Sequence, residues 1–298
     1  MNLSIFDKLS AVKITPDNRI TDADRQFCEA HQKAYHHAKE GLRNLMEQWD
    51  SLQNQQEEFL KIDTHSKNAF GSYISVDHMK TRDFESEIEH LAYEFIERLV
   101  RYFNFTYHVE IKYRPIQEFL LPKEPDRYES TKQEKEDFHA KLQAVSLRYE
   151  DVLEQIFIQL GGRTFTERAL DEIKAKCHTA AWNSYNKEAE FVLRNETLQL
   201  TSYACSCDSW YNPPRWELQS KTKEILRGIA HFEFGAFGQY PISISEILGY
   251  DNRANPQVFY DCKKVQQLRM FKNGRVDIKF ASKEYAEQFV SDYLGRVY

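Results

Sequence analysis

The N-terminal part of the chain shows a long helical period of apolar positions. Apolar side chains recur every three or four residues from residue 27 to residue 52, with charged and amide side chains between them. Thr21 or Asp22 can cap this helix, which we expect to run to about Leu60. The stripe consists of Phe27, Ala30, Ala34, Ala38, Leu42, Leu45, Trp49 and Leu52. The polar residues 53–58 predict that the end of the helix projects into solvent or meets a partner.

A second helix follows a predicted loop at residues 66–77. Its stripe consists of Phe84, Ile88, Leu91, Phe95, Leu99 and Phe103. Alternation and β-branched residues then predict a strand at residues 107–113, which Pro115 ends. Residues 122–135 are charged and contain two prolines, so they are the best candidate for a boundary. We therefore predict a mainly helical domain at residues 1–125 and an α+β domain at residues 126–298.

The second half alternates helices with hairpins. One helical period runs from Phe138 to Leu160, and Gly161-Gly162 ends it. Thr166 can begin another helix toward Trp182. Apolar positions from residue 218 to residue 232 predict one more helix after Pro213-Pro214. The fold class predicted from these elements is α+β.

Two hairpins can be predicted together with their registers. A turn at Asn195-Glu196 pairs Leu193 with Leu198 and Phe191 with Leu200. Near the C-terminus, a two-residue loop at Asn273-Gly274 would place Met270 opposite Asp277.

A three-residue loop at residues 272–274 instead places Met270 opposite Val276 and Arg269 opposite Asp277. This second register gives one apolar face and one opposite-charge pair, so we predict it, with Gly274 in a left-handed conformation. Ser282 can then cap a short helix.

Composition bounds the class of protein. The chain has 298 residues, of which 14% are aromatic. Because it contains only 10 glycines, we do not expect a glycine-rich phosphate-binding loop. The net charge of −6 argues against direct binding of nucleic acid. Five cysteines indicate a reducing compartment rather than a disulfide framework. Residues 1–8 lack the apolar core of a signal peptide, and no apolar run is long enough for a membrane span. We therefore expect a cytoplasmic protein.

No residue constellation marks an active site. Cys205-x-Cys207 could contribute two metal ligands, but structural zinc sites usually combine two such pairs, so we expect free cysteines and no metal. We also predict no cofactor and no catalytic residues. A basic cluster at Lys221, Lys223 and Arg227 could contact phosphate, although ordinary solubilising charge on an exposed face is the preferred explanation.

Aromatic residues near Pro213-Pro214 are the best candidates for a binding surface. Trp210, Tyr211 and Trp216 lie in a segment without a clear period, where aromatic residues either fill the core or anchor an interface. We predict that they contact a partner. The tip of the C-terminal hairpin is the predicted second contact, through Phe271, Lys272 and Arg275.

Three segments of the second half resemble an uncharacterised domain family of phages, plasmids and other mobile elements. They are Leu193-Arg194-Asn195, Lys221-x-x-x-Ile225-Leu226 and Met270-Phe271-Lys272-Asn273-Gly274-x-Val276-x-Ile278-Lys279-Phe280. The resemblance covers residues 150–295. Among such proteins, the length and layout resemble phage-encoded inhibitors of the Gabija defence system.

This resemblance implies a non-catalytic protein of the infected host's cytoplasm. It implies binding to a host nuclease–helicase complex, self-association around that complex and blocked access to DNA. The alternative is a DNA-associated accessory protein or nuclease of a mobile element. Self-association also has an alternative, since the long first helix could instead pair within the chain with the helix around Phe84 and Phe103.

Overall fold

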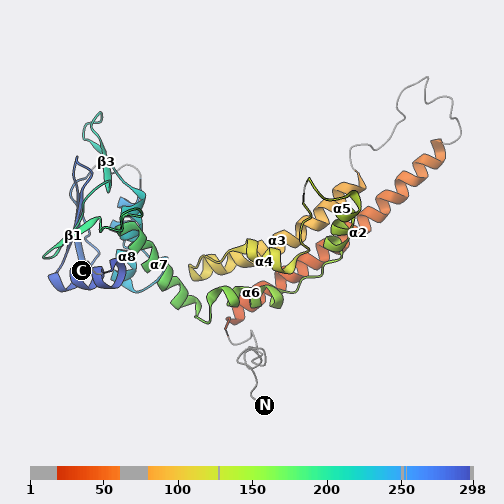
Figure 1. Cartoon of the computed structure of the whole chain (residues 1–298), viewed down its shortest axis with the longest axis horizontal. Helices are drawn as coiled ribbons and strands as arrows, with labels where there is room; N and C mark the ends of the chain where they lie inside the picture. The colour runs from red at the N-terminus through yellow and green to blue at the C-terminus, as the bar shows by residue number, and fades with distance from the viewer. Residues whose placement is uncertain (1–18, 61–79, 127, 250–251, 253, 296–298) are drawn as a thin grey trace, which may run out of the picture. The chain divides into compact units, whose positions relative to one another are not determined.

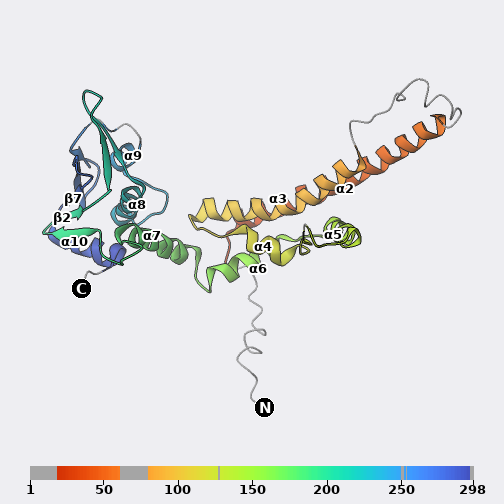
Figure 2. The same ribbon diagram turned by 45° about the horizontal axis from the view of Figure 1, so that its top comes forward.

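The computed structural model describes residues 19–60, 80–126, 128–249, 252 and 254–295 and shows an α+β fold (Figures 1 and 2). Contacts divide the chain into two units. Unit 1 is Met1–Thr106 with Ile111–Thr164, and unit 2 is Tyr107–Glu110 with Phe165–Tyr298. The predicted boundary after residue 125 falls inside unit 1, because later helices pack on the first one. The predicted start at residues 1–8 and the loop at residues 66–77 lie outside the described residues.

Five helices are described up to the end of unit 1: α2 (Asp22–Leu60), α3 (Thr81–Tyr107), α4 (Tyr113–Leu120), α5 (Lys132–Ala144) and α6 (Tyr149–Leu160). The predicted start of α2 is confirmed. The Thr21 amide donates to the Asp24 carboxylate at 2.7 Å, and the Asp24 amide donates to the Thr21 hydroxyl at 3.2 Å. This reciprocal pair satisfies two amides at the end of the helix.

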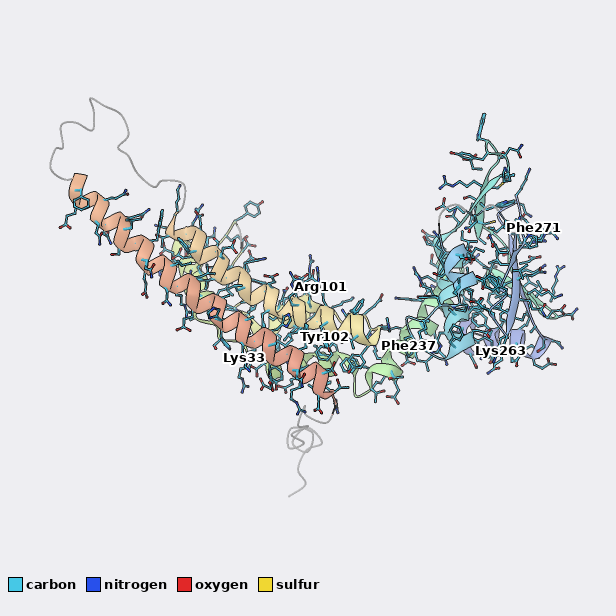
Figure 3. The ribbon with its side chains drawn as sticks, turned by 180° about the vertical axis from the view of Figure 1, so that it is seen from behind. Lys33, Arg101, Tyr102, Phe237, Lys263 and Phe271 are labelled. Atoms are coloured by element: carbon cyan, nitrogen blue, oxygen red, sulfur yellow. The ribbon has the colours of Figure 1, made fainter. Side chains whose placement is uncertain are left out.

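Helices α2 and α3 lie side by side and pack through aromatic rings (Figures 1 and 2). The pairs are Phe27–Tyr102, Tyr35–Phe95 and Trp49–Phe84, with centroids 3.7, 4.9 and 6.4 Å apart. Figure 3 labels Tyr102 on this seam. The predicted α2 stripe is partly wrong, since Ala30 and Ala34 are exposed while Cys28 and Lys39 are buried. The large rings of the seam, rather than the small alanines, determine which face of α2 is covered.

The predicted single helix from Phe138 to Leu160 is wrong, because the chain leaves the helix between α5 and α6. Side chains of α2 bind the backbone groups that the break releases. Tyr35 and Lys39 donate to the Val145 carbonyl, with the hydroxyl at 3.3 Å, and the Tyr149 amide donates to the Gln32 side chain at 2.6 Å. These distant partners replace the lost helical hydrogen bonds.

The predicted strand at residues 107–113 is also wrong. Buried and exposed side chains do alternate here, since Val109 and Ile111 are buried. However, the backbone bonds to side-chain amides instead of to a neighbouring strand. Asn104 bonds the amide and the carbonyl of Ile111 at 2.8 and 2.9 Å. Gln159 bonds both backbone groups of Lys112 at 3.0 and 2.8 Å.

Unit 2 packs helices against one face of an antiparallel sheet. The helices are α7 (Phe165–Ala181), α8 (Ser220–Phe234), α9 (Ile242–Ile247) and α10 (Lys283–Phe289), which continues as the π-helix η3 (Val290–Leu294). The five-stranded sheet has the order β1-β2-β7-β6-β5. Its strands are β1 (Phe191–Arg194), β2 (Thr197–Leu200), β5 (Gln257–Val258), β6 (Val265–Met270) and β7 (Val276–Phe280).

Both predicted hairpin registers are confirmed. In β1–β2, Phe191 pairs with Leu200 and Leu193 pairs with Leu198. In β6–β7, Met270 pairs with Val276, so the loop has three residues, and Gly274 has a φ of +82°.

The other helices predicted in the second half are also present, and some of their ends differ by a few residues from the predicted ones. The Ser282 hydroxyl accepts from the Tyr285 amide and caps α10 as predicted. Glycines in the left-handed region at residues 161 and 162 follow α6. Leu218, predicted in the helix that becomes α8, lies in a strand instead.

A separate two-stranded hairpin, β3 (Cys205–Asp208) and β4 (Arg215–Leu218), occupies the segment predicted to be irregular. It was missed because its turn contains two prolines and neither strand contains a β-branched residue. The hairpin positions every candidate residue of the predicted aromatic surface.

Candidate protein-interaction surface

The turn of the β3–β4 hairpin holds an indole almost fully in solvent. Trp210 is 97% exposed, and the neighbouring Tyr211 is also exposed. The Trp210 amide donates to the Asp208 carboxylate at 3.1 Å, which fixes the backbone of the turn. A large apolar side chain held outward by an ordered turn is a candidate anchor for another protein.

Trp216 does not belong to this surface. It lies in β4 opposite Cys207 and is only 8% exposed. Its backbone exchanges two hydrogen bonds with Asn252, and its side chain joins the core of unit 2. The prediction that Trp216 contacts a partner is therefore corrected, because alternation along β4 turns this side chain inward.

The tip of the β6–β7 hairpin, residues 271–275, carries the other predicted contacts. Phe271, labelled in Figure 3, is half-buried, and its neighbour Lys272 is exposed. The Arg275 guanidinium lies 4.1 Å from the centroid of the Phe271 ring, and the Arg269 guanidinium lies 5.2 Å from it. Arg275 also forms an ion pair with Asp277, at 3.1 Å between Nε and Oδ1. Phe271, Lys272 and Arg275 are therefore brought together.

The two groups of candidates lie at opposite ends of the β3–β4 hairpin, with Trp210 in its turn and the β6–β7 tip beside its base. The Gly274 carbonyl accepts from the Ala204 amide at 2.7 Å, so the β6–β7 tip docks on the base of β3–β4. Trp210 is six residues beyond Ala204, and the four residues of β3 between them span about 13 Å. Tyr203, at the base, is 84% exposed and lies beside the tip. Sequence reasoning did not connect Tyr203 or Arg269 with Phe271, because only the docking of the two hairpins brings them together.

The thiols of this region are packed rather than poised for chemistry. Cys205 is buried, and its Sγ lies 3.4 Å from the carbonyl oxygens of Phe271 and Arg275. Burial raises the pKa of the Cys205 thiol, so the protonated form dominates. Among the described residues, no group of three or more potential ligands is placed to hold a metal ion.

The basic cluster on α8 is engaged in ion pairs. Lys221 pairs with Glu190 at 2.7 Å, and Arg227 pairs with Glu224. The Lys221 ammonium and the Asn183 amide hold the pKa of Glu190 below its usual value against the effect of burial. These pairs already neutralise charge that a phosphate group would need.

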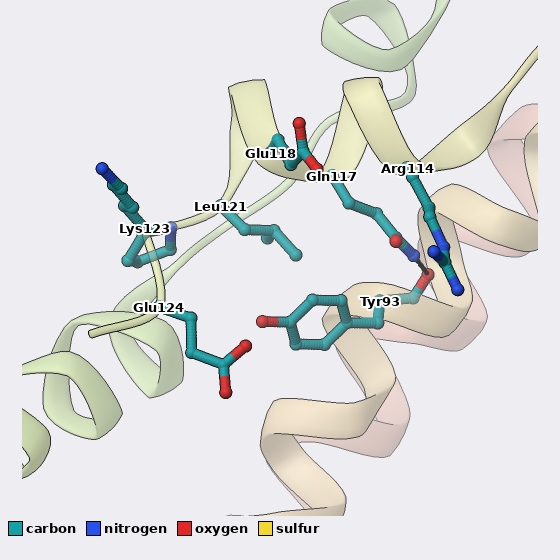
Figure 4. Close-up of a pocket in the computed structure, with 8 residues that line it drawn as sticks. Tyr93, Arg114, Gln117, Glu118, Leu121, Lys123 and Glu124 are labelled. Carbon is teal, nitrogen blue, oxygen red and sulfur yellow. Dashed lines mark hydrogen bonds between the residues drawn. The ribbon is translucent and has the colours of Figure 1, made fainter. Parts of the chain in front are cut away.

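Unit 1 contains an open pocket of about 580 Å³ between α3, α4 and the chain after α4 (Figure 4). Its lining mixes both charges, with Arg114 and Lys123 alongside Glu118 and Glu124. Burial and then the nearby carboxylates of Glu124 and Glu89 raise the pKa of Tyr93. The phenol therefore stays protonated at neutral pH, and the pocket shows no nucleophile paired with a base.

Comparisons with protein-family models, with curated proteins and with solved structures find no match to this chain. Within the described part of the chain, every helix is too short or too polar to cross a membrane.

Proposed function

We propose that this chain is a non-catalytic binding protein that inhibits a larger protein complex by covering its surface, with unit 2 supplying the contact. The observation that carries this proposal is the nearly complete exposure of Trp210 on an ordered turn. An exposed indole is unfavourable in water and is a frequent anchor of interfaces.

The target named by the resemblance is the Gabija nuclease–helicase complex of an infected host cell. That part of the proposal depends on the resemblance of residues 150–295 alone. Occlusion requires affinity and size rather than reactive groups, so a surface of rigid aromatic and cationic side chains is sufficient for it.

Binding to the purified nuclease–helicase complex tests the proposal. Trp210→Ala should weaken binding at least about thirtyfold, since an anchor typically contributes about 2 kcal/mol or more. Tyr185→Ala is the matched control, because Tyr185 is an aromatic residue of unit 2 that is 95% exposed elsewhere. Both variants should melt as the native protein does.

Two results would contradict the proposal. One is the absence of binding and of any rescue of phage growth by the native chain. The other is an equal effect of the two substitutions. A complex with DNA that persists only at low salt would support the alternative, a DNA-associated accessory protein.

We further propose that α2 mediates self-association. Leu45, Leu52 and Phe59 are exposed and lie seven residues apart, the spacing of one row of a coiled coil. The covered part of α2 ends near Asp50, which accepts from the Thr81 hydroxyl at the start of α3 at 2.6 Å. Helix α2 continues beyond that point (Figure 1).

The flanks of this row suit a second identical helix. Gln48 and Gln55 lie beside it and carry no charge, so two copies meet without like-charge repulsion. The intramolecular pairing of α2 with α3 is therefore compatible with an additional partner. Multivalent contact in an assembly increases avidity for a large target.

Light scattering tests this assembly. The native chain should exceed its monomer mass of 35.4 kDa at micromolar concentration. The double variant Leu45→Gln/Leu52→Gln should return to the monomer mass, whereas Ile158→Gln, which changes an exposed residue of α6, should not. A native chain that is strictly monomeric would refute self-association.

A further inference from the structure

The β6–β7 tip concentrates positive charge around one aromatic ring. Arg269 and Arg275 lie 5.2 and 4.1 Å from the centroid of the Phe271 ring, and Lys272 is exposed beside it. Asp277 forms an ion pair with Arg275. Across the described residues, neither Arg269 nor Lys272 has an ion pair within 4 Å. Asp277, the cross-strand neighbour of Arg269, pairs with Arg275, so the tip carries an excess of positive charge.

Hydrogen bonds within the tip and to the base of the β3–β4 hairpin fix the backbone of the tip. Phe271 and Arg275 are joined by a hydrogen bond of 2.9 Å from amide to carbonyl, and the Gly274 amide donates to the Phe271 carbonyl at 2.9 Å. The Gly274 carbonyl accepts from the amides of Ala204 and Cys205 at 2.7 and 3.3 Å. With its backbone fixed, the tip presents its side chains at a low entropic cost.

We infer that the β6–β7 tip binds an acidic segment of a partner protein. This inference depends on the proposed protein-binding function and specifies the chemistry of the partner. Carboxylates of the segment pair with Arg269 and Lys272, while an apolar group packs on the edge of Phe271. Guanidinium and ammonium groups at a rigid site are complementary to such carboxylates.

A nucleic acid fits this tip less well. Arginine guanidinium groups occupy positions over the Phe271 ring, so a base can stack there only by displacing one of them. The outer face of the sheet also presents carboxylates, with Asp277 beside Arg275 and Glu196 at the far end of β7, 3.7 Å from Lys279. A polyanion would meet these carboxylates along the sheet.

Fluorescence anisotropy with two labelled probes tests the inference. The probes are an oligoglutamate peptide and a single-stranded oligodeoxynucleotide of equal charge, and the protein is the full chain. Arg269→Gln/Lys272→Gln should raise the Kd for the peptide about fivefold to tenfold, the sum of two exposed ion pairs. Lys283→Gln is the matched control, because Lys283 is an exposed cation beyond the opposite end of β7.

The expected result is peptide binding that weakens with salt and is lost selectively in the double variant. Equal effects of the double variant and the control would overturn the inference, as would the absence of peptide binding. Tighter binding of the oligonucleotide through the same two residues would also overturn it.

The two proposals can fail separately. Failure to bind the nuclease–helicase complex with intact peptide binding refutes only the proposed target. Binding to that complex with peptide affinity unchanged by the double variant refutes only the acidic-segment inference.

Discussion

Replacing Gly228 with alanine should separate helices α7 and α8. A Cβ at this position would lie 2.2 Å from the Sγ of Cys177, whereas its next neighbours, in Tyr293 and Phe289, are at 3.4 and 3.7 Å. Ordinary van der Waals contact begins at about 3.5 Å, so the single sulfur atom produces the conflict. Cys177 is fully buried and cannot move into solvent.

The magnitude follows from two opposing effects. Overpacking a rigid core costs about 3 kcal/mol at the upper end of its usual range. Alanine in a helix interior recovers about 1 kcal/mol relative to glycine. Gly228→Ala should therefore lower the free energy of unfolding by about 2 kcal/mol. Gly41→Ala is the matched control, since nothing lies within 4 Å of its added Cβ in α2, and it should stabilise the chain by up to about 1 kcal/mol.

A double-mutant cycle in urea isolates the contact. Cys177→Ala removes the sulfur, so Gly228→Ala in that background should be neutral or stabilising, with a coupling energy of about 2–3 kcal/mol. Circular dichroism and tryptophan fluorescence should report the same transition for unit 2. If Gly228→Ala is as stable as the native chain, or if Cys177→Ala brings no relief, the close approach of α7 and α8 is refuted.

Two further predictions concern the pH dependence of stability and the hydrogen bonds that a side chain makes to the backbone. Burial raises the pKa values of the Cys177 and Cys262 thiols from 9.0 to about 12, so unit 2 should lose stability as the pH rises above 9. In unit 1, burial raises the pKa of Cys28 to about 12 but lowers the pKa of Lys39 from 10.5 to about 8. Between pH 8 and 10.5 the folded state releases the lysine proton while the unfolded state keeps it, so the stability of unit 1 rises with pH there. This gain opposes the loss caused by the Cys28 thiol. Urea unfolding should be followed by the fluorescence of variants that keep tryptophan in one unit only. The loss of unfolding free energy at alkaline pH should be larger for unit 2, and equal losses in the two units would contradict this. Asn104→Ala should lower the unfolding free energy by about 2–3 kcal/mol, because it leaves two backbone groups of a buried residue unpaired; an unchanged melting temperature would refute that role.

Features determined by neighbouring residues could be predicted from the sequence. The start of α2 depends on a pair three residues apart, Thr21 and Asp24. The β6–β7 register depends on which apolar residues share a face and on the single glycine at residue 274. In each case the deciding interaction is local, so the pattern contains the information needed.

Features determined by distant partners could not be predicted. The break between α5 and α6 depends on side chains of α2 that are more than one hundred residues away. The segment containing Val109 alternates as a strand does, yet its partners are amides from helices. Trp216 was assigned to the surface because nothing nearby in the sequence indicates that Asn252 pairs with it. Of the candidate surface, the tip residues were grouped correctly, while Tyr203 joined them only through the docking of two hairpins.

The division of the chain into units also determines how the protein can be dissected. The segment Tyr107–Glu110 belongs to unit 2, where Tyr107 stacks on Phe165 at 4.3 Å and the Glu110 amide donates to the Glu172 carboxylate at 2.8 Å. The polypeptide therefore crosses between the units three times rather than once. One proteolytic cut cannot release an intact unit 2, and a recombinant fragment beginning at Phe165 lacks part of its own fold. The two units are interleaved along the sequence, so a dissection that keeps unit 2 whole has to supply residues 107–110 together with the segment that begins at Phe165.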